Sequence, residues 1–212
     1  MSKKVLAILG AGELGKQIAN IAIEDNHYDS TVFYDDNLYK TKKSTLKVLG
    51  PIEDDIISKD YKNKVFSELI VGVGYNYLFE RKKLFEKFSK NIKIATIIHS
   101  SSFIDTSAII KSGTVIYPNC TIDKGVVIQE NTVINLSSVI SHDSKIGAHS
   151  FLSPGVCVAG NTSLGKMCFF GISTTISGSV YVCDKVQTGA GTVVVDNLTK
   201  QGLYFGVPAR KK

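Results

Sequence analysis

The 212-residue chain is predicted to fold as an α/β unit followed by a parallel β-helix. A glycine-rich turn between an apolar strand and a helix predicts the first part, and an apolar residue at every sixth position predicts the second. Composition changes between the two: residues 1–97 carry 29 charged side chains in 97 positions, and residues 98–212 carry 15 in 115. We therefore expect two domains, residues 1–97 and residues 98–212.

The first domain opens with a strand, a glycine turn and a helix. Lys4 to Leu9 is a short apolar run, Gly10 to Gly15 has the spacing GxGxxG, and a helical stretch continues to Ile23. Glycines at this spacing let a phosphate approach the backbone at the start of a helix. The motif is weak when it occurs alone, but its position between a strand and a helix supports it here.

The next segments extend this unit. Thr31 to Tyr34 is predicted as a second strand, and Asp35 and Asp36 follow it about twenty residues after the glycines. Glu68 to Val73 is predicted as a third strand that ends at a Gly74 turn, and Leu78 to Lys90 as a helix. These elements predict a small Rossmann-like domain.

The ligand of the glycine turn stays open at this point. A nicotinamide cofactor is less favoured, because about ninety residues hold only half of a dinucleotide-binding domain. A nucleotide sugar would use the same backbone amides for its phosphates and a carboxylate for its ribose or base. A glycine turn without a ligand is the third possibility.

The six-residue period of the second half begins at Ile98 and ends at Val194. Sixteen of these seventeen positions are apolar, and the residues two places earlier, from Ala108 to Thr192, are all small or β-branched. A period of six excludes an amphipathic helix and equals three strand repeats, so each pair shares one strand face. A chain that turns every six residues forms a three-sided coil, and seventeen positions give about five coils of eighteen residues.

Net charge identifies no partner. The total of +6 divides into +3 for each domain, so we expect no nucleic-acid binding, and the basic run Lys40 to Lys47 is interpreted as a solvated loop. No signal or membrane-spanning segment is recognisable, which predicts a cytoplasmic protein without membrane contact. The four cysteines lack zinc-ligand spacing and are interpreted as small structural residues.

The repeat and the ending Gly206 to Ala209 resemble the left-handed β-helix of hexapeptide acyltransferases. Together with the first domain, the chain resembles bacterial N-acetyltransferases of nucleotide-linked 4-amino-4,6-dideoxy sugars and their sialic-acid O-acetyltransferase-like relatives. The stretches that carry the resemblance are Gly10–Gly15, Tyr34–Asp36, Val73–Asn76, His99, Asn135–Asp143 and Ala159–Asn161. It implies acetyl-CoA as co-substrate, a UDP- or dTDP-linked sugar held by the first domain, and a homotrimer with active sites between subunits.

The resemblance also assigns roles to residues. His142 matches the general base of the family and Asp143 the carboxylate that orients it. An imidazole, with an ordinary pKa of about 6.5, suits the removal of a proton from an attacking amine. Gly160 matches the backbone N–H that stabilises the oxyanion, and Ile172 and Ala190 match the coenzyme A groove. The expected substrate-binding residues are Gly12, Glu13, Leu14, Asp35, Asp36, Gly74 and Asn135.

One position departs from the family. Many relatives carry a second histidine nine residues after the first, and this chain has Phe151 there. His149 is a possible replacement, but an exposed histidine without function is the favoured interpretation.

Other functions remain open at this point. They are O-acetylation of a sugar hydroxyl, a nucleotide-binding module without chemistry, and a β-helix that serves only as a scaffold. A zinc β-helix is disfavoured, because the three histidines of the repeat lack metal-ligand spacing, and no metal is expected.

Overall fold

The structure is a computed structural model that describes residues 3–41 and 45–212. The chain forms two compact units, Met1–Ile97 and Ile98–Lys212. The basic run from Lys40 to Lys47 lies partly outside the described residues.

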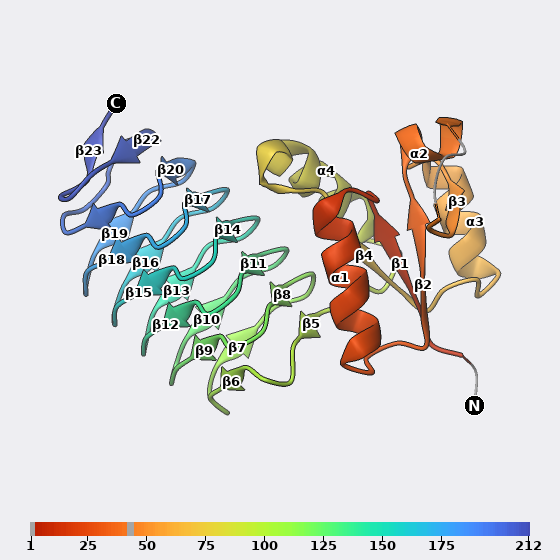
Figure 1. The fold of residues 1–212 in the computed structure, drawn as a ribbon, viewed down its shortest axis with the longest axis horizontal. Coiled ribbons are helices and arrows are strands. Elements are labelled where there is room, and N and C mark those ends of the chain that lie inside the picture. Colours follow the sequence, from red (N-terminus) through yellow and green to blue (C-terminus); the bar gives the residue numbers. More distant parts are fainter. Residues whose placement is uncertain (1–2, 42–44) are drawn as a thin grey trace. The chain divides into compact units, whose positions relative to one another are not determined.

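The first unit is a parallel four-stranded sheet in the order β3-β2-β1-β4, flanked by helices (Figure 1). The strands are β1 (Val5–Leu9), β2 (Ser30–Tyr34), β3 (Val48–Gly50) and β4 (Glu68–Val71). The helices are α1 (Glu13–Glu24), α2 (Asp36–Thr41), α3 (Asp54–Lys62) and α4 (Leu78–Phe88), with the short 3₁₀ helix η1 (Tyr75–Tyr77) before α4. The predicted α/β class is confirmed.

Three elements between β2 and β4 were not predicted. Helix α2 has no buried residue and α3 has only Ile57, so neither produces the apolar period of an amphipathic helix. Strand β3 has three residues, which is too short for an alternating pattern. These elements add an edge strand beside β2.

Both faces of this sheet are covered. Gly15 of α1 lies against Ile8, which points to one face of β1. On the other face, Ala7 and Leu9 belong to a core cluster with Ile57 of α3 and Phe85 of α4. The carboxyl ends of β1, β2 and β4 therefore meet at one edge, where the glycine turns and the aspartates follow the strands.

The second unit is a left-handed β-helix of short parallel strands (Figure 1). The eight-stranded sheet holds β5 (Ile97–Ile98), β8 (Val115–Ile116), β11 (Val133–Ile134), β14 (Phe151–Leu152), β17 (Phe169–Phe170), β20 (Val186–Thr188), β22 (Gly202–Phe205) and the antiparallel β23 (Arg210–Lys211). The six-stranded sheet holds β6 (Phe103–Ile104), β9 (Thr121–Ile122), β12 (Val139–Ile140), β15 (Cys157–Val158), β18 (Thr175–Ile176) and β21 (Val193–Val194). The five-stranded sheet holds β7 (Ile109–Ile110), β10 (Val127–Ile128), β13 (Lys145–Ile146), β16 (Ser163–Leu164) and β19 (Tyr181–Val182).

The six-residue series supplies the interior of this β-helix. From Ile116 to Val194, every member of the series is buried. Up to β21, paired strands lie 18 residues apart, as in Val133 beside Phe151, so the coil length is the predicted one. The one polar member, Thr188, shares a 2.8 Å hydrogen bond with the hydroxyl of Thr174 and accepts one from the Gly171 N–H.

The small residues two places earlier fill the corners. Their hydroxyls donate to the carbonyl fifteen residues further along, which lies in the next coil. Ser138 donates to Ser153, Ser144 to Ala159 and Thr162 to Ser177. These bonds satisfy buried polar groups at the turns, where strand pairing cannot reach them.

From Gly113 to Gly191, each corner also contains one residue in the left-handed conformation. The non-glycine examples of the β-helix are Asn119, Asn131, Ser137, Asp143, His149, Asn161, Met167, Ser173, Ser179 and Lys185. Asn and Asp tolerate this conformation better than most residues, and the remaining corners use glycine.

Within residues 3–41 and 45–212, no helix is both long and apolar enough to cross a membrane.

Strand β13 offers a matched test of the inward and outward positions. Ile146 is fully buried, whereas Lys145 on the same strand is exposed. We expect Ile146→Ala to lower the free energy of unfolding by about 2–5 kcal/mol, because it leaves a cavity between coils. Lys145→Ala should change it by less than about 0.5 kcal/mol. Urea unfolding measures both, and equal losses would contradict the inward assignment of the six-residue series.

Candidate functional site

His142 and Asp143 lie at the corner between the six-stranded and five-stranded sheets, after β12 and before β13. The His142 Nδ1 atom is 3.0 Å from Asp143 Oδ2, and the two side chains are 53% and 59% exposed. A carboxylate can only accept a hydrogen bond, so the ring donates through Nδ1, and in the neutral imidazole Nε2 then keeps its lone pair. The arrangement presents a basic nitrogen to solvent at a fixed ring orientation.

Two glycines make room for this pair, one in each neighbouring coil. A methyl group at Gly160 would lie 2.5 Å from His142 Nε2, and one at Gly125 would lie 2.5 Å from Asp143 Oδ1. Any side chain at either position would displace the ring or the carboxylate. Gly160 was predicted as a site residue, whereas Gly125 was missed, although its place 18 residues before Asp143 could have revealed it.

The Gly160 backbone has its own use. Its carbonyl oxygen accepts from the Ser179 N–H at 3.0 Å. The Asn161 N–H beside it donates to the His142 carbonyl oxygen. Among the backbone hydrogen bonds of the described residues, none uses the Gly160 N–H. That donor is therefore available to a ligand next to the imidazole.

Asn135, Ile172 and Ala190 lie at a different corner, between the eight-stranded and six-stranded sheets. Ile172 is 55% exposed and Ala190 is also exposed. The Asn135 Oδ1 atom accepts from the Leu136 N–H at 2.8 Å. Within one chain, the six-stranded sheet thus separates these three residues from His142 and Gly160.

His149 occupies the third corner and corrects an expectation. It was predicted to be exposed, but it is only 5% exposed, and its Nδ1 lies 3.0 Å from Asn131 Nδ2. Asn131 is 18 residues earlier, directly below His149 in the stack of coils. Phe151, nine residues after His142, is buried with its ring centroid 6.0 Å from that of Phe169.

In the α/β unit, the fold requires some glycines of the turns after β1 and β4 but not others. Gly10 has φ +95°, and a methyl group at Gly15 would overlap the Gly10 carbonyl oxygen. Gly12 and Gly74 have φ near −75° and nothing within 4 Å of an added methyl group. Neither conformation nor packing requires glycine at these two positions, so the open space above them is free for a ligand.

Gly12 is also the N-cap of α1 and has no side chain to satisfy the first amides of the helix. The helix start therefore exposes its N–H donors, which favour an anion. Leu14 is buried, so its side chain is not exposed at this helix start. Glu13 is exposed and pairs with Lys16 at 2.6 Å.

The predicted aspartates hold loops together. Asp35 Oδ2 accepts from the Ala11 N–H at 2.9 Å, and its Oδ1 accepts from the Asn37 and Leu38 N–H groups. Asp36 Oδ1 accepts from the Ile52 N–H at 2.8 Å. These bonds tie the end of β2 to the glycine turn and to the loop after β3.

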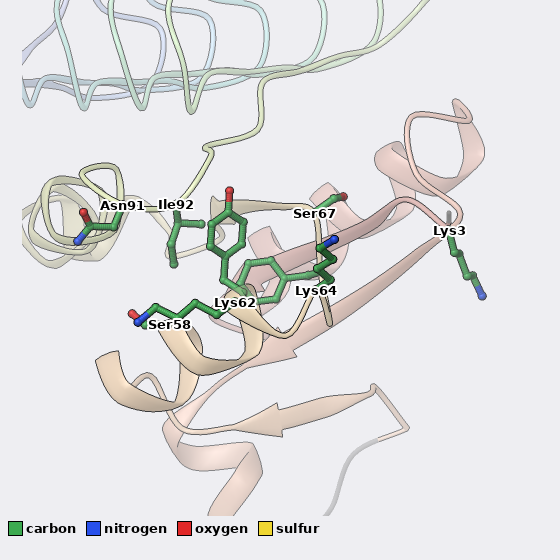
Figure 2. A pocket seen from close by; sticks show the side chains of 9 residues that line it. Lys3, Ser58, Lys62, Lys64, Ser67, Asn91 and Ile92 are labelled. Atoms are coloured by element: carbon green, nitrogen blue, oxygen red, sulfur yellow. The ribbon is translucent and has the colours of Figure 1, made fainter. Parts of the chain in front are cut away.

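A hollow of about 790 Å³ opens at the other edge of the same sheet. Lys3, Ser58, Tyr61, Lys62, Lys64, Phe66, Ser67, Asn91 and Ile92 line it. Lys3 and Ser67 precede β1 and β4, whereas the glycine turns follow these strands. Figure 2 shows Lys3 apart from the other labelled residues, so the cations do not converge on one point. None of the predicted site residues lies here.

Among the described residues, no group of three or more His, Cys, Asp or Glu side chains is placed to hold a metal ion.

Known proteins resemble this chain over its whole length. The family described as the PglD N-terminal domain matches residues 5–88. The acetyltransferase domain of PglB from Neisseria gonorrhoeae, solved with acetyl coenzyme A, is 25% identical with a TM-score of 0.88, covering 100% of both chains. PerB from Caulobacter crescentus, solved with CoA and GDP-perosamine, is 25% identical with a TM-score of 0.87, covering 100% of this chain and 98% of PerB.

A curated relative matches a shorter stretch. The UDP-3-O-acylglucosamine N-acyltransferase of Bordetella avium is 40% identical over 60 residues, which is 28% of this chain. The chain spans 17% of the length of that relative.

The glycine turn allows a test of stability alone. We expect Gly15→Ala to lower the free energy of unfolding by about 1–3 kcal/mol, because its methyl group overlaps the Gly10 carbonyl. Gly12→Ser should raise it by a few tenths of a kcal/mol, about the difference between Ser and Gly at an N-cap. Urea unfolding separates the two, and a large loss for Gly12→Ser would mean that Gly12 is required by the fold.

Proposed function

We propose that the chain is an N-acetyltransferase related to the PglD-like proteins, and that it transfers the acetyl group of acetyl-CoA to the amine of a nucleotide-linked amino sugar. The observation that carries the proposal is the His142–Asp143 pair, oriented at 3.0 Å, with Nε2 over Gly160. The substrate proposed in detail is a 4-amino-4,6-dideoxy sugar linked to UDP or dTDP. Because PerB was solved with GDP-perosamine, GDP-linked sugars should be tested beside those linked to UDP and dTDP.

His142 is proposed as the general base. The sugar amine attacks the thioester carbonyl carbon, and Nε2 accepts the proton that the nitrogen loses. Asp143 holds the ring through Nδ1 and stabilises the imidazolium that forms. The carbon–sulfur bond then breaks, and the imidazolium returns its proton to the departing sulfur. The products are the N-acetyl sugar nucleotide and coenzyme A.

Gly160 is proposed to stabilise the tetrahedral intermediate. Its N–H is a free backbone donor beside the imidazole, and a fixed donor requires no reorganisation when charge develops on the thioester oxygen. The same glycine also leaves room for the ring. One position thus serves the base and the oxyanion together.

The nucleotide is proposed to bind at the carboxyl edge of the α/β sheet. The uncapped start of α1 offers N–H donors to a diphosphate, and the space above Gly12 and Gly74 admits it. Asp35 and Asp36 act chiefly by holding this edge in shape, since both already accept backbone N–H groups. A carboxylate retains further lone pairs, so contact with the ribose or base stays part of the proposal.

Catalysis is proposed to occur between the subunits of a homotrimer. The six-stranded sheet presents outward residues that carry no charge, namely Phe103, Thr121, Val139, Cys157, Thr175 and Val193. Phe103, Val139 and Cys157 are exposed in a single chain. If this face turns toward a threefold axis, one edge of the face meets the opposite edge of the neighbour.

That arrangement would complete the site. One edge of the six-stranded sheet carries His142 and Gly160, and the other carries Ile172 and Ala190. Packing around the axis brings the base of one subunit beside the proposed coenzyme A residues of the next. The separation of these residues within one chain is therefore the main support for a shared site.

The catalytic pair can be tested by substitution. We expect His142→Asn to lower kcat roughly 10²–10⁴-fold, the usual contribution of a general base. Asp143→Asn should lower it less, because the base remains but loses its orientation. Thiol release from acetyl-CoA is measured over a panel of UDP-, dTDP- and GDP-linked 4-amino sugars. His149→Asn is the control at another corner and should keep kcat, whereas near-wild-type turnover by His142→Asn would refute the assignment of the base.

The shared site predicts that two inactive variants restore each other. His142→Asn removes the base, and Ile172→Asp places a charge in the proposed coenzyme A groove. In randomly mixed trimers about a quarter of the sites combine an intact His142 with an intact Ile172 from the neighbour. We therefore expect coexpression to recover about a quarter of wild-type activity, an estimate that follows from the closed symmetry.

Size measurement supplies the control for this experiment. Val139→Asp on the six-stranded face should dissociate the assembly in light-scattering chromatography, whereas Ser163→Asp at an outward position of the five-stranded sheet should not. Lack of recovery in mixed trimers of confirmed composition would place each site within one subunit.

A further inference from the structure

Arg81 is a charged residue in an apolar position of α4. Its side chain is fully buried, at 0% exposure, on the helix face that also buries Leu78, Phe85 and Phe88. Its Nη1 atom donates to the carbonyl oxygens of Val71 at 2.6 Å and Val73 at 3.1 Å. Burial of a guanidinium is costly, and hydrogen bonds offset that cost only in part. An apolar side chain would fill the same position without the cost, so packing alone does not explain an arginine here.

The two carbonyls belong to the turn that follows β4. Val71 is the last residue of β4, and Val73 precedes Gly74. Arg81 therefore bonds to the backbone on both sides of Gly72. One guanidinium nitrogen fixes the path of the chain as it leaves the strand toward Gly74.

Gly72 connects this turn with the first glycine turn. Its N–H donates to the Leu9 carbonyl oxygen at 2.8 Å, and an added methyl group would lie 2.8 Å from the Gly15 Cα atom. A methyl group at Gly10 would in turn contact Gly72 and Val73. The turn after β4 and the turn after β1 thus approach each other closely, and the Cγ2 methyl groups of Val73 and Ile8 pack beside their backbones. The position of Gly74 relative to Gly12 depends on this contact and on Arg81.

We propose that Arg81 is a positioning residue, which sets the Gly74 turn beside the Gly12 turn so that both backbones receive the diphosphate of the nucleotide sugar. This inference rests on the proposed function of the glycine turns. An apolar side chain of similar size would fill the interface between α4 and the sheet but would leave both carbonyls without this donor. The buried charge also adds positive potential below the turns, which favours an anionic ligand.

Three variants separate positioning from packing. Arg81→Met keeps most of the volume and removes the donor, Arg81→Lys keeps the charge and one donor group, and Phe88→Leu disturbs the same buried face without bonding to the turn. The measurements are KM for the nucleotide sugar, KM for acetyl-CoA, kcat, thermal unfolding, and the affinities of UDP, dTDP and GDP by calorimetry.

We expect Arg81→Met to weaken nucleotide affinity roughly 10–100-fold, the range for a lost hydrogen bond to a charged group. Arg81→Lys should lie between this variant and the wild type. In both variants, kcat and KM for acetyl-CoA should change less than about twofold, because the acetyl-transfer site is not involved. Phe88→Leu should lower the unfolding temperature without changing KM for the nucleotide sugar.

The outcomes also distinguish this inference from the proposed function. If the wild type binds no nucleoside diphosphate, or Gly12→Ser binds it as well as the wild type, the nucleotide site itself is wrong. If the wild type binds and Gly12→Ser does not, but Arg81→Met binds normally, the positioning role is overturned. If Arg81→Met fails to fold, Arg81→Lys and Phe88→Leu still decide: equal KM effects at equal loss of stability would mean that Arg81 only supports the fold.

Discussion

The stacking of coils in an 18-residue register is the constraint on which the β-helix depends. Each strand of two residues pairs with the strand one coil away, so every corner residue lies over its equivalent in the next coil. Buried hydroxyls such as that of Ser144 link the same corners through the carbonyl fifteen residues on. A side chain at a corner is therefore confined by what stands 18 residues before and after it. His142 is accommodated because Gly160 is above it, and Asp143 because Gly125 is below.

In both units, glycines leave space that a side chain would otherwise fill. In the β-helix, Gly125 and Gly160 leave space for the side chains of Asp143 and His142, the proposed catalytic pair. In the α/β unit, Gly15 and Gly72 allow two turns to approach each other, while Gly12 and Gly74 leave space that the chain does not fill. Glycines of the first two kinds support the fold, and those of the last kind point to a ligand. The sequence alone does not separate glycines that the fold requires from glycines that leave space for a ligand, because the GxGxxG motif contains both.

The sequence predicted the features that depend on a repeating local pattern and missed those that depend on contacts between distant residues. The apolar series from Ile98 to Val194 defined the coils, because every coil repeats the same inward and corner environment. His142, Asp143 and Gly160 were identified by resemblance, and their juxtaposition follows from the 18-residue register. Helices α2 and α3 were missed because they bury almost nothing. Buried His149 contacts Asn131 in the coil before it, and the proposed role of Arg81 rests on its bonds to the carbonyls of Val71 and Val73. A local reading of the chain contains neither contact.

Because the coils have equal length, the corners of the β-helix are evenly spaced along its axis. Insertion or removal of one 18-residue coil would move every later corner along the axis by one strand spacing, about 4.8 Å, and leave its local surroundings intact. The distance along the β-helix axis between the proposed base His142 and the proposed groove residue Ala190 therefore changes only in steps of one coil. It can be adjusted by whole coils but not by single residues, since a shift of one residue would turn the interior series outward. The number of coils therefore sets the length of a ligand that can lie along one corner of the β-helix.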